Sequence, residues 1–197
     1  MTEANCCPPV AVVTGSSSGI GRAIAIEFTL AGYRVLLHGR KPSAQLDAVE
    51  QELLAIQSGQ LTADPNGKQA LVEKIYGDFS QPIDWQQFVD DAWAKLGPVD
   101  CWVNNAGGDV LTNDWADRPI EEKLDYLWKT DVTASLMLSR HAGRRMIDEA
   151  GRFQRKQLNG RDRIDCKYRL GSSQSGDGRG QWRVVRHDER SLSLIHI

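Results

Sequence analysis

Near the start of the chain, glycines and hydroxyl side chains are spaced as the binding of a phosphate group requires. An apolar run over residues 10–13 ends in Thr-Gly, three serines follow, and Gly-Ile-Gly opens a helical pattern. Glycines permit a tight turn and a close approach to a pyrophosphate, and a helix N-terminus offers free N–H groups. This order favours a dinucleotide site over an ordinary glycine-rich turn. The residues expected to bind are Thr14, Gly15, Ser17, Ser18, Gly19, Ile20 and Gly21.

The second apolar run indicates which dinucleotide is bound. Residues 33–38 read as a buried strand, and the position after such a strand holds an acidic residue when NAD is bound through its ribose 2′-hydroxyl. Here the chain continues His38-Gly39-Arg40-Lys41, with no acid. An arginine can bind the 2′-phosphate of NADP through charge-assisted hydrogen bonds, so Arg40 favours NADP, with NAD less favoured. The alternative is a solvated basic turn.

Two motifs together indicate a family. Residues 14–21 read Thr-Gly-x-x-x-Gly-Ile-Gly, and residues 104–107 read Asn-Asn-Ala-Gly. This pair resembles the short-chain dehydrogenase/reductase family over about residues 8–150. The resemblance implies hydride transfer between the nicotinamide of NADP and a small-molecule carbonyl or alcohol. It also implies that Asn104 steadies its strand. It places the following residues at the cofactor: Asp78, Phe79, Asn105, Ala106 and Gly107.

Apolar segments of strand type and helix type alternate along the chain, which predicts an α/β fold with a Rossmann-type, doubly wound parallel sheet. The expected strands are 10–13, 33–38, 70–76 and 99–103, and the expected helices are 20–31, 44–57 and 84–96, with a long helix beginning at Pro119. In such sheets ligands bind beyond the carboxyl ends of the strands. The turn at Gly15, Arg40, Asp78 and Asn105 all follow strands, so we expect them to share one site.

The long helix carries a candidate catalytic residue. At helical periodicity Asp131 falls on the same face as Leu124, Leu127, Trp128, Ser135 and Leu138. A carboxylate on an apolar face is costly unless it has a partner. The family resemblance implies that Asp131 takes the place of an asparagine that helps to hold a catalytic water chain. An acid partnered at a helix kink is the structural alternative.

The resemblance stops after about residue 150. The family's Tyr-x-x-x-Lys pair, in which the lysine lowers the pKa of a tyrosine acid or base, is absent, because no tyrosine is followed four residues later by lysine. Residues 151–197 carry 11 Lys and Arg against 5 Asp and Glu, whereas residues 1–150 carry 13 against 21. We expect 151–197 to be an irregular basic tail, either disordered or translated in a shifted frame. Read one base forward with permissible codons, residues 164–190 can end in FGTTK.

This interpretation makes the chain a fragment, with residues 8–150 as a partial NAD(P)-binding domain and a sheet incomplete at its C-terminal side. The strand at 99–103 is then expected at an exposed sheet edge. The fragment is expected to be inactive, and a non-catalytic dinucleotide-binding protein is the alternative. For the full-length parent the resemblance allows a homo-oligomer.

Composition narrows the remaining classes. Apolar residues make up 41% of the chain and charged residues 25%, as in globular proteins. No apolar run suits a membrane span and the N-terminus lacks signal-peptide character, so a cytoplasmic location is expected. The four cysteines, at 6, 7, 101 and 166, have no metal-binding spacing and are expected to be free thiols. Binding of nucleic acid through the tail is not expected, because its aromatic residues are scattered.

Overall fold

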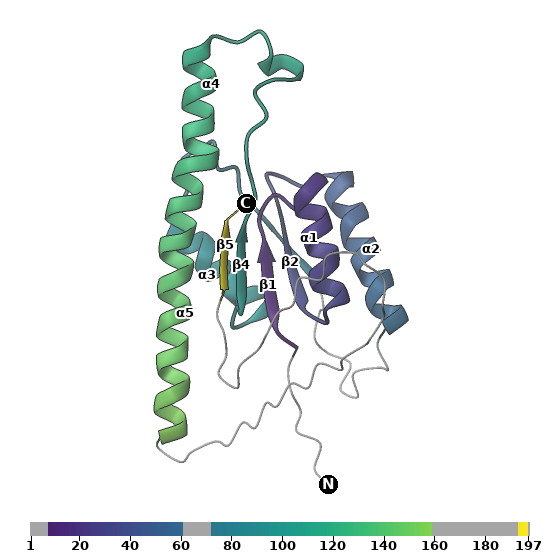
Figure 1. The fold of residues 1–197 in the computed structure, drawn as a ribbon, viewed down its shortest axis with the longest axis vertical. Helices are drawn as coiled ribbons and strands as arrows, with labels where there is room; N and C mark the ends of the chain where they lie inside the picture. Colours follow the sequence, from purple (N-terminus) through teal and green to yellow (C-terminus); the bar gives the residue numbers. More distant parts are fainter. Residues whose placement is uncertain (1–7, 61–71, 159–192, 197) are drawn as a thin grey trace, which may run out of the picture.

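A computed structural model describes residues 8–60, 72–158 and 193–196. A parallel five-stranded sheet lies between two layers of helices, which is the α/β Rossmann-type architecture expected from the sequence (Figure 1). The strands are β1 (Val10–Val13), β2 (Arg34–Gly39), β3 (Val72–Tyr76), β4 (Cys101–Asn104) and β5 (Ser193–His196). Their order across the sheet is β3-β2-β1-β4-β5. The chain therefore reverses direction across the sheet between β1 and β4, where such folds bind ligands.

The helices begin and end close to the positions predicted. They are α1 (Gly19–Leu30), α2 (Ala44–Gln60), α3 (Trp85–Leu96), α4 (Ile120–Leu127) and α5 (Ala134–Leu158). Ser43 accepts a hydrogen bond from Leu46 N–H at 3.2 Å at the start of α2, and Asp84 accepts one from Gln87 N–H at 3.0 Å at the start of α3. These side chains satisfy N–H groups that have no partner within the helix.

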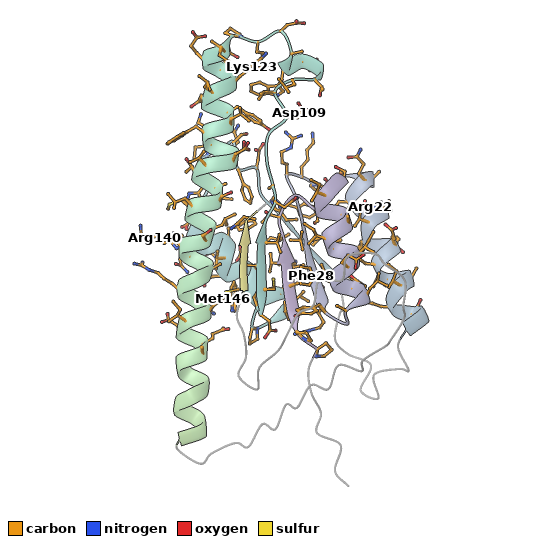
Figure 2. The ribbon with its side chains drawn as sticks, in the orientation of Figure 1. Arg22, Phe28, Asp109, Lys123, Arg140 and Met146 are labelled. Carbon is orange, nitrogen blue, oxygen red and sulfur yellow. The ribbon has the colours of Figure 1, made fainter. Side chains whose placement is uncertain are left out.

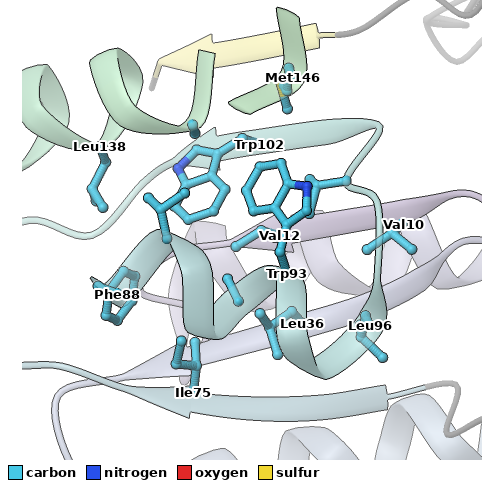
Figure 3. Close-up of a cluster of buried hydrophobic side chains, with 14 of the residues drawn as sticks. Val10, Val12, Leu36, Ile75, Phe88, Trp93, Leu96, Trp102, Leu138 and Met146 are labelled. Atoms are coloured by element: carbon cyan, nitrogen blue, oxygen red, sulfur yellow. The ribbon is translucent and has the colours of Figure 1, made fainter. Parts of the chain in front are cut away.

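Alternate strand residues face two separate cores. Ala11, Val13 and Leu37 pack beneath α1 and α2, whereas Val12, Leu36 and Trp102 pack beneath α3 and α5. The indole of Trp102 is fully buried and stacks on Trp93, with ring centroids 5.9 Å apart (Figure 3). A sheet covered on both faces explains why its strands read as continuous apolar runs.

The long helical region departs from a single α-helix. Between α4 and α5 the backbone forms a π-helical segment, η2 (Trp128–Thr133). The apolar face predicted from a constant period of 3.6 is therefore wrong in its first half: Trp128 is 64% exposed and Leu124 is also exposed. Beyond η2 the buried face of α5 is formed by Ala134, Leu138, Ala142 and Met146. Figure 1 shows that this helical region extends past both ends of the sheet.

Residues after 150 also differ from the expected irregular tail where the structure describes them. Helix α5 continues to Leu158, and β5 pairs in parallel with β4, with Cys101 opposite Ser193 and Asn104 opposite His196. Strand β4 is consequently not at the edge, contrary to expectation. Pairing provides partners for backbone groups that an edge strand would expose. Residues 159–192, including the segment considered in a shifted frame, lie outside the described residues.

Two further observations concern the expectations from composition. Cys101 is a free, buried thiol whose pKa is raised to about 12 by desolvation, which makes it unreactive. Cys6, Cys7 and Cys166 lie outside the described residues. None of the helices in the described part of the chain is both long and apolar enough to cross a membrane.

The core beneath α5 gives the first prediction. Leu138→Ala removes a side chain that is 1% exposed in the cluster with Trp102 and Met146, and should lower the free energy of unfolding by about 2–5 kcal/mol. Urea unfolding measures this change. Ile147→Ala, at a position 70% exposed on the same helix, is the control and should change it by less than about 0.5 kcal/mol. Equal effects of the two substitutions would contradict the placement of α5.

Candidate functional site

The turn after β1 and the end of β4 are held together by a small hydrogen-bond network. The Thr14 hydroxyl accepts from the backbone N–H groups of Asn105 at 2.9 Å and Ala106 at 3.0 Å. In return the Asn105 side-chain amide donates to the carbonyl oxygens of Thr14 at 3.0 Å and Gly15 at 3.2 Å. The two sequence motifs, some 90 residues apart, thus form one continuous surface.

Glycine is required where these strands approach each other. Gly15 has a φ of +66°, and a Cβ there would lie 2.7 Å from the Ala106 Cα. A Cβ on Gly21 would collide with the Gly15 carbonyl oxygen and the Asn105 amide. A Cβ on Gly19, by contrast, would meet nothing within 4 Å, so the start of α1 is open. Ser18 precedes α1 without capping it through its side chain, which leaves the helix N–H groups free for an anion.

Asn104 joins the site to α5. Its side-chain oxygen accepts from the Trp102 indole at 3.0 Å, and its side-chain amide donates to the Ser139 hydroxyl at 3.0 Å. Because Asn104 is buried, both bonds satisfy polar atoms that would otherwise be costly. This arrangement matches the strand-steadying part that the family resemblance implies for the first asparagine of the motif.

His38, at the end of β2, is a structural residue that the sequence reasoning did not single out. The Gly15 N–H donates to His38 Nδ1 at 3.0 Å, so Nε2 carries the proton and donates to the Gly77 carbonyl oxygen at 3.0 Å. The imidazole also stacks on Phe79, with centroids 4.5 Å apart. Complete burial lowers the pKa of His38 to about 4, and the ring is therefore neutral. Its signal in the sequence was a polar residue ending an otherwise apolar strand.

These strand ends surround a cleft of about 520 Å³. Nine of the residues predicted to bind the cofactor line it: Gly15, Ser17, Ser18, Arg40, Asp78, Phe79, Asn105, Ala106 and Gly107. The other four lie elsewhere. Thr14 is buried behind the cleft and Gly21 beneath the turn, Gly19 lines a neighbouring groove, and Ile20 is exposed.

The second wall of the cleft comes from the loop after β4 and from α4, and no pattern in the sequence indicates it. Trp115, Arg118 and Tyr126 line the cleft, with the rings of Trp115 and Tyr126 4.3 Å apart. Within this loop Asp109 accepts hydrogen bonds from the Thr112 hydroxyl and, more weakly, from the Leu111 N–H, and both hold the pKa of Asp109 below its ordinary value. Figure 2 shows Asp109 beyond the carboxyl ends of the strands.

Asp131 does not lie where the sequence placed it. The predicted position on a buried apolar face is wrong, because Asp131 belongs to η2, where the helical period changes, and it is exposed. Its carboxylate accepts hydrogen bonds from the Gly108 N–H at 2.8 Å and the Thr130 hydroxyl at 2.7 Å. Asp131 is thus outside the cleft lining and fastens the loop after β4 to the helical region.

A family model described as short chain dehydrogenase matches residues 9–153 of the chain. The chain is 34% identical over 143 residues to a probable chloroplastic chlorophyll(ide) b reductase from Oryza sativa subsp. japonica, covering 68% of this chain and 27% of that protein. It is 30% identical over 142 residues to a short-chain type dehydrogenase/reductase from Picea abies, covering 72% of this chain and 50% of that protein. The chain spans half the length of these relatives, or less.

Two solved structures have similar folds. A metagenomic short-chain oxidoreductase in complex with NADP is 31% identical, with a TM-score of 0.58 over 74% of this chain and 60% of that one. A 3-oxoacyl (acyl-carrier-protein) reductase from Agrobacterium tumefaciens C58 with NADP bound is 27% identical, with a TM-score of 0.58 over 75% of this chain and 51% of that one.

The burial of His38 gives a prediction on pH. In the unfolded chain His38 takes up a proton near pH 6.5, whereas in the folded chain it does so only near pH 4. The contribution of His38 to folding stability should therefore fall as the pH drops from 6.5 to 4 and stay constant at lower pH. The expected decrease in the free energy of unfolding from this group is about 3 kcal/mol. Urea unfolding of the wild-type chain and His38→Asn from pH 7.5 to 4 measures it. The stability advantage of the wild type should shrink as the pH falls, and a constant advantage would contradict the prediction.

Proposed function

Because the chain belongs to the short-chain dehydrogenase/reductase family, we propose that it is the cofactor-binding part of an NADP-dependent oxidoreductase. The observation that carries this proposal is the cleft at which the carboxyl ends of β1, β2 and β4 and the segment after β3 meet. When bound, the nicotinamide cofactor supplies hydride transfer to a carbonyl or from an alcohol. The chain supplies binding and orientation.

The residues present fit such a cofactor. The free N–H groups at the start of α1 and the open space above Gly19 suit a pyrophosphate. Arg40 lines the cleft and, among the described residues, forms no ion pair, so its guanidinium is available to a phosphate. We propose that Asp78 and Phe79 adjoin the adenine. The Asp78 carboxylate is held in place by two hydrogen bonds that it accepts from Ser80. The two NADP-bound relatives support NADP in preference to NAD.

We propose that the chain binds the cofactor without turning over substrate. The reason is the absence of Tyr-x-x-x-Lys from its 197 residues, which removes the expected proton donor of a carbonyl reduction. Asp131 is proposed as a positioning residue rather than an acid or base, since it holds Gly108 beside the cleft through its carboxylate. A non-catalytic dinucleotide-binding protein remains the second candidate, and the same absence favours it.

The substrate class and the cellular setting stay predictions. A small-molecule carbonyl or alcohol is the class proposed for a complete enzyme, and a cytoplasmic location comes from the sequence alone. A homo-oligomer is proposed for the full-length parent. Exposed apolar side chains spaced four residues apart on α4, η2 and α5 offer a surface for it: Leu124, Trp128, Val132 and Leu136. Light scattering would refute this proposal if the full-length protein had the mass of a monomer at all concentrations.

Arg40→Gln tests the cofactor. Loss of the guanidinium should weaken the binding of NADP+ by roughly 10- to 100-fold, as expected for hydrogen bonds to a charged group, and leave NAD+ binding unchanged. Isothermal titration calorimetry measures both affinities. Arg140→Gln, on the exposed side of α5 and remote from the cleft, is the matched control. If the wild-type chain binds NADP+ no better than NAD+, the proposed cofactor preference is wrong.

An assay of turnover tests the proposal that this chain binds the cofactor without catalysing a reaction. The oxidation of NADPH at 340 nm, measured with a panel of aldehydes and ketones, should not exceed the rate without protein. The same assay with Arg40→Gln is the control for a contaminating reductase, because a contaminant would be unaffected. Turnover by the wild-type chain that Arg40→Gln reduces would refute the non-catalytic candidate and show that another group donates the proton.

A further inference from the structure

The side chain of Tyr126, on α4, is held against the cleft from two directions. Its ring packs on Trp115 at a centroid distance of 4.3 Å and an interplanar angle of 33°. It also lies on the backbone of Gly108, where a Cβ would collide with the Tyr126 ring carbon Cε1. The ring therefore occupies space that any residue other than glycine at position 108 would fill.

The backbone beneath the ring is itself fixed. The Gly108 N–H donates to the Asp131 carboxylate, and the Thr130 hydroxyl lies 2.7 Å from the same carboxylate oxygen and 3.0 Å from the Tyr126 carbonyl oxygen. These contacts join the loop after β4 to the last turn of α4 and to η2. Tyr126, on α4, consequently has a defined position relative to the loop after β4, which forms one wall of the cleft.

The hydroxyl of Tyr126 lies near Arg40, the residue that the sequence predicts to bind the 2′-phosphate. Arg40 Nη1 donates to it at 3.4 Å, which is long for a hydrogen bond. The Tyr126 hydroxyl keeps its own proton for a further acceptor, and the guanidinium keeps further N–H donors. No carboxylate in the described part of the chain pairs with Arg40, whereas Arg118, 4.4 Å above the Trp115 ring, is paired with Glu122 at 3.3 Å.

We propose that Tyr126 is a specificity-determining residue that donates a hydrogen bond to the ribose 2′-phosphate of NADP while it orients Arg40. The inference rests on the proposed cofactor. A phosphate monoester offers several acceptor oxygens, and a guanidinium with a neighbouring hydroxyl supplies donors from two elements, β2 and α4. In a Rossmann fold the preference between NAD and NADP is usually attributed to the residue after the second strand. Here it would depend on α4 as well as on the residue after β2.

Tyr126→Phe tests this inference in the full 197-residue chain, because it removes only the hydroxyl and leaves the ring on Gly108 and Trp115. NADP+ binding should weaken about tenfold, the value of one hydrogen bond to a charged group, while NAD+ binding stays the same. Tyr76→Phe is the matched control, since Tyr76 is an exposed tyrosine at the end of β3 that does not line the cleft. Calorimetry measures the affinities of the wild-type chain and of both variants for NADP+ and NAD+.

A second pair of ligands isolates the contribution of the 2′-phosphate to binding. Adenosine 2′,5′-bisphosphate should lose affinity in Tyr126→Phe by the same factor as NADP+, and adenosine 5′-monophosphate should not. In the Arg40→Gln background, Tyr126→Phe should cost less than in the wild-type chain, because the two residues act on one group. A purely structural role of Tyr126 would weaken the binding of ligands with and without the 2′-phosphate alike.

The outcomes separate the inference from the proposed function. If the wild-type chain prefers NADP+ and Tyr126→Phe changes both cofactors equally or neither, the inference is overturned and the proposed cofactor stands. If the wild-type chain shows no preference for NADP+, the proposed cofactor fails and the inference fails with it. A loss confined to the 2′-phosphorylated ligands supports both.

Discussion

The approach of β1 to β4 is the constraint on which the site depends. Two strand ends that are distant in sequence come so close that Gly15 has no room for a Cβ beside Ala106, and Gly21 in α1 has none beside Gly15 and Asn105. Thr14 and Asn105 exchange hydrogen bonds across this contact, so the backbone at both strand ends is fixed before any ligand binds. Gly15 and Gly21 are thus needed for the contact between these segments of the chain as well as for a close approach to a phosphate.

His38 extends the same rigidity to the other strands. Through Gly15 and Gly77 it links the turn after β1 to the segment after β3, and its ring stacks on Phe79. The floor of the cleft therefore contains a neutral imidazole rather than a charge. Two cationic side chains line the cleft, Arg40 and Arg118, and of these Arg118 is paired with Glu122. Carboxylates line it as well: Asp78, Asp109 and Asp114.

The features that depend on neighbouring residues in the chain could be predicted from the sequence. The helices expected at 44–57 and 84–96 are present as α2 and α3, and the order of strands and motifs brings Arg40 and Asn105 to one cleft. The wall formed by Trp115 and Tyr126 could not be predicted, because it depends on how an irregular loop packs against a helix. The pairing of β5 with β4 was missed for a related reason: four residues carry too little periodicity to indicate a partner strand.

The error at Asp131 has a definite origin, since a constant helical period was assumed through a π-helical segment. That segment changes how the region responds to the length of the chain. A π-helical turn holds one residue more than an α-helical turn. Loss of one residue within η2 would therefore convert it to α-helix and leave Leu138 and Met146 facing the core. Loss of one residue from α5 between Ala134 and Leu138 would instead turn both side chains by about 100° away from it.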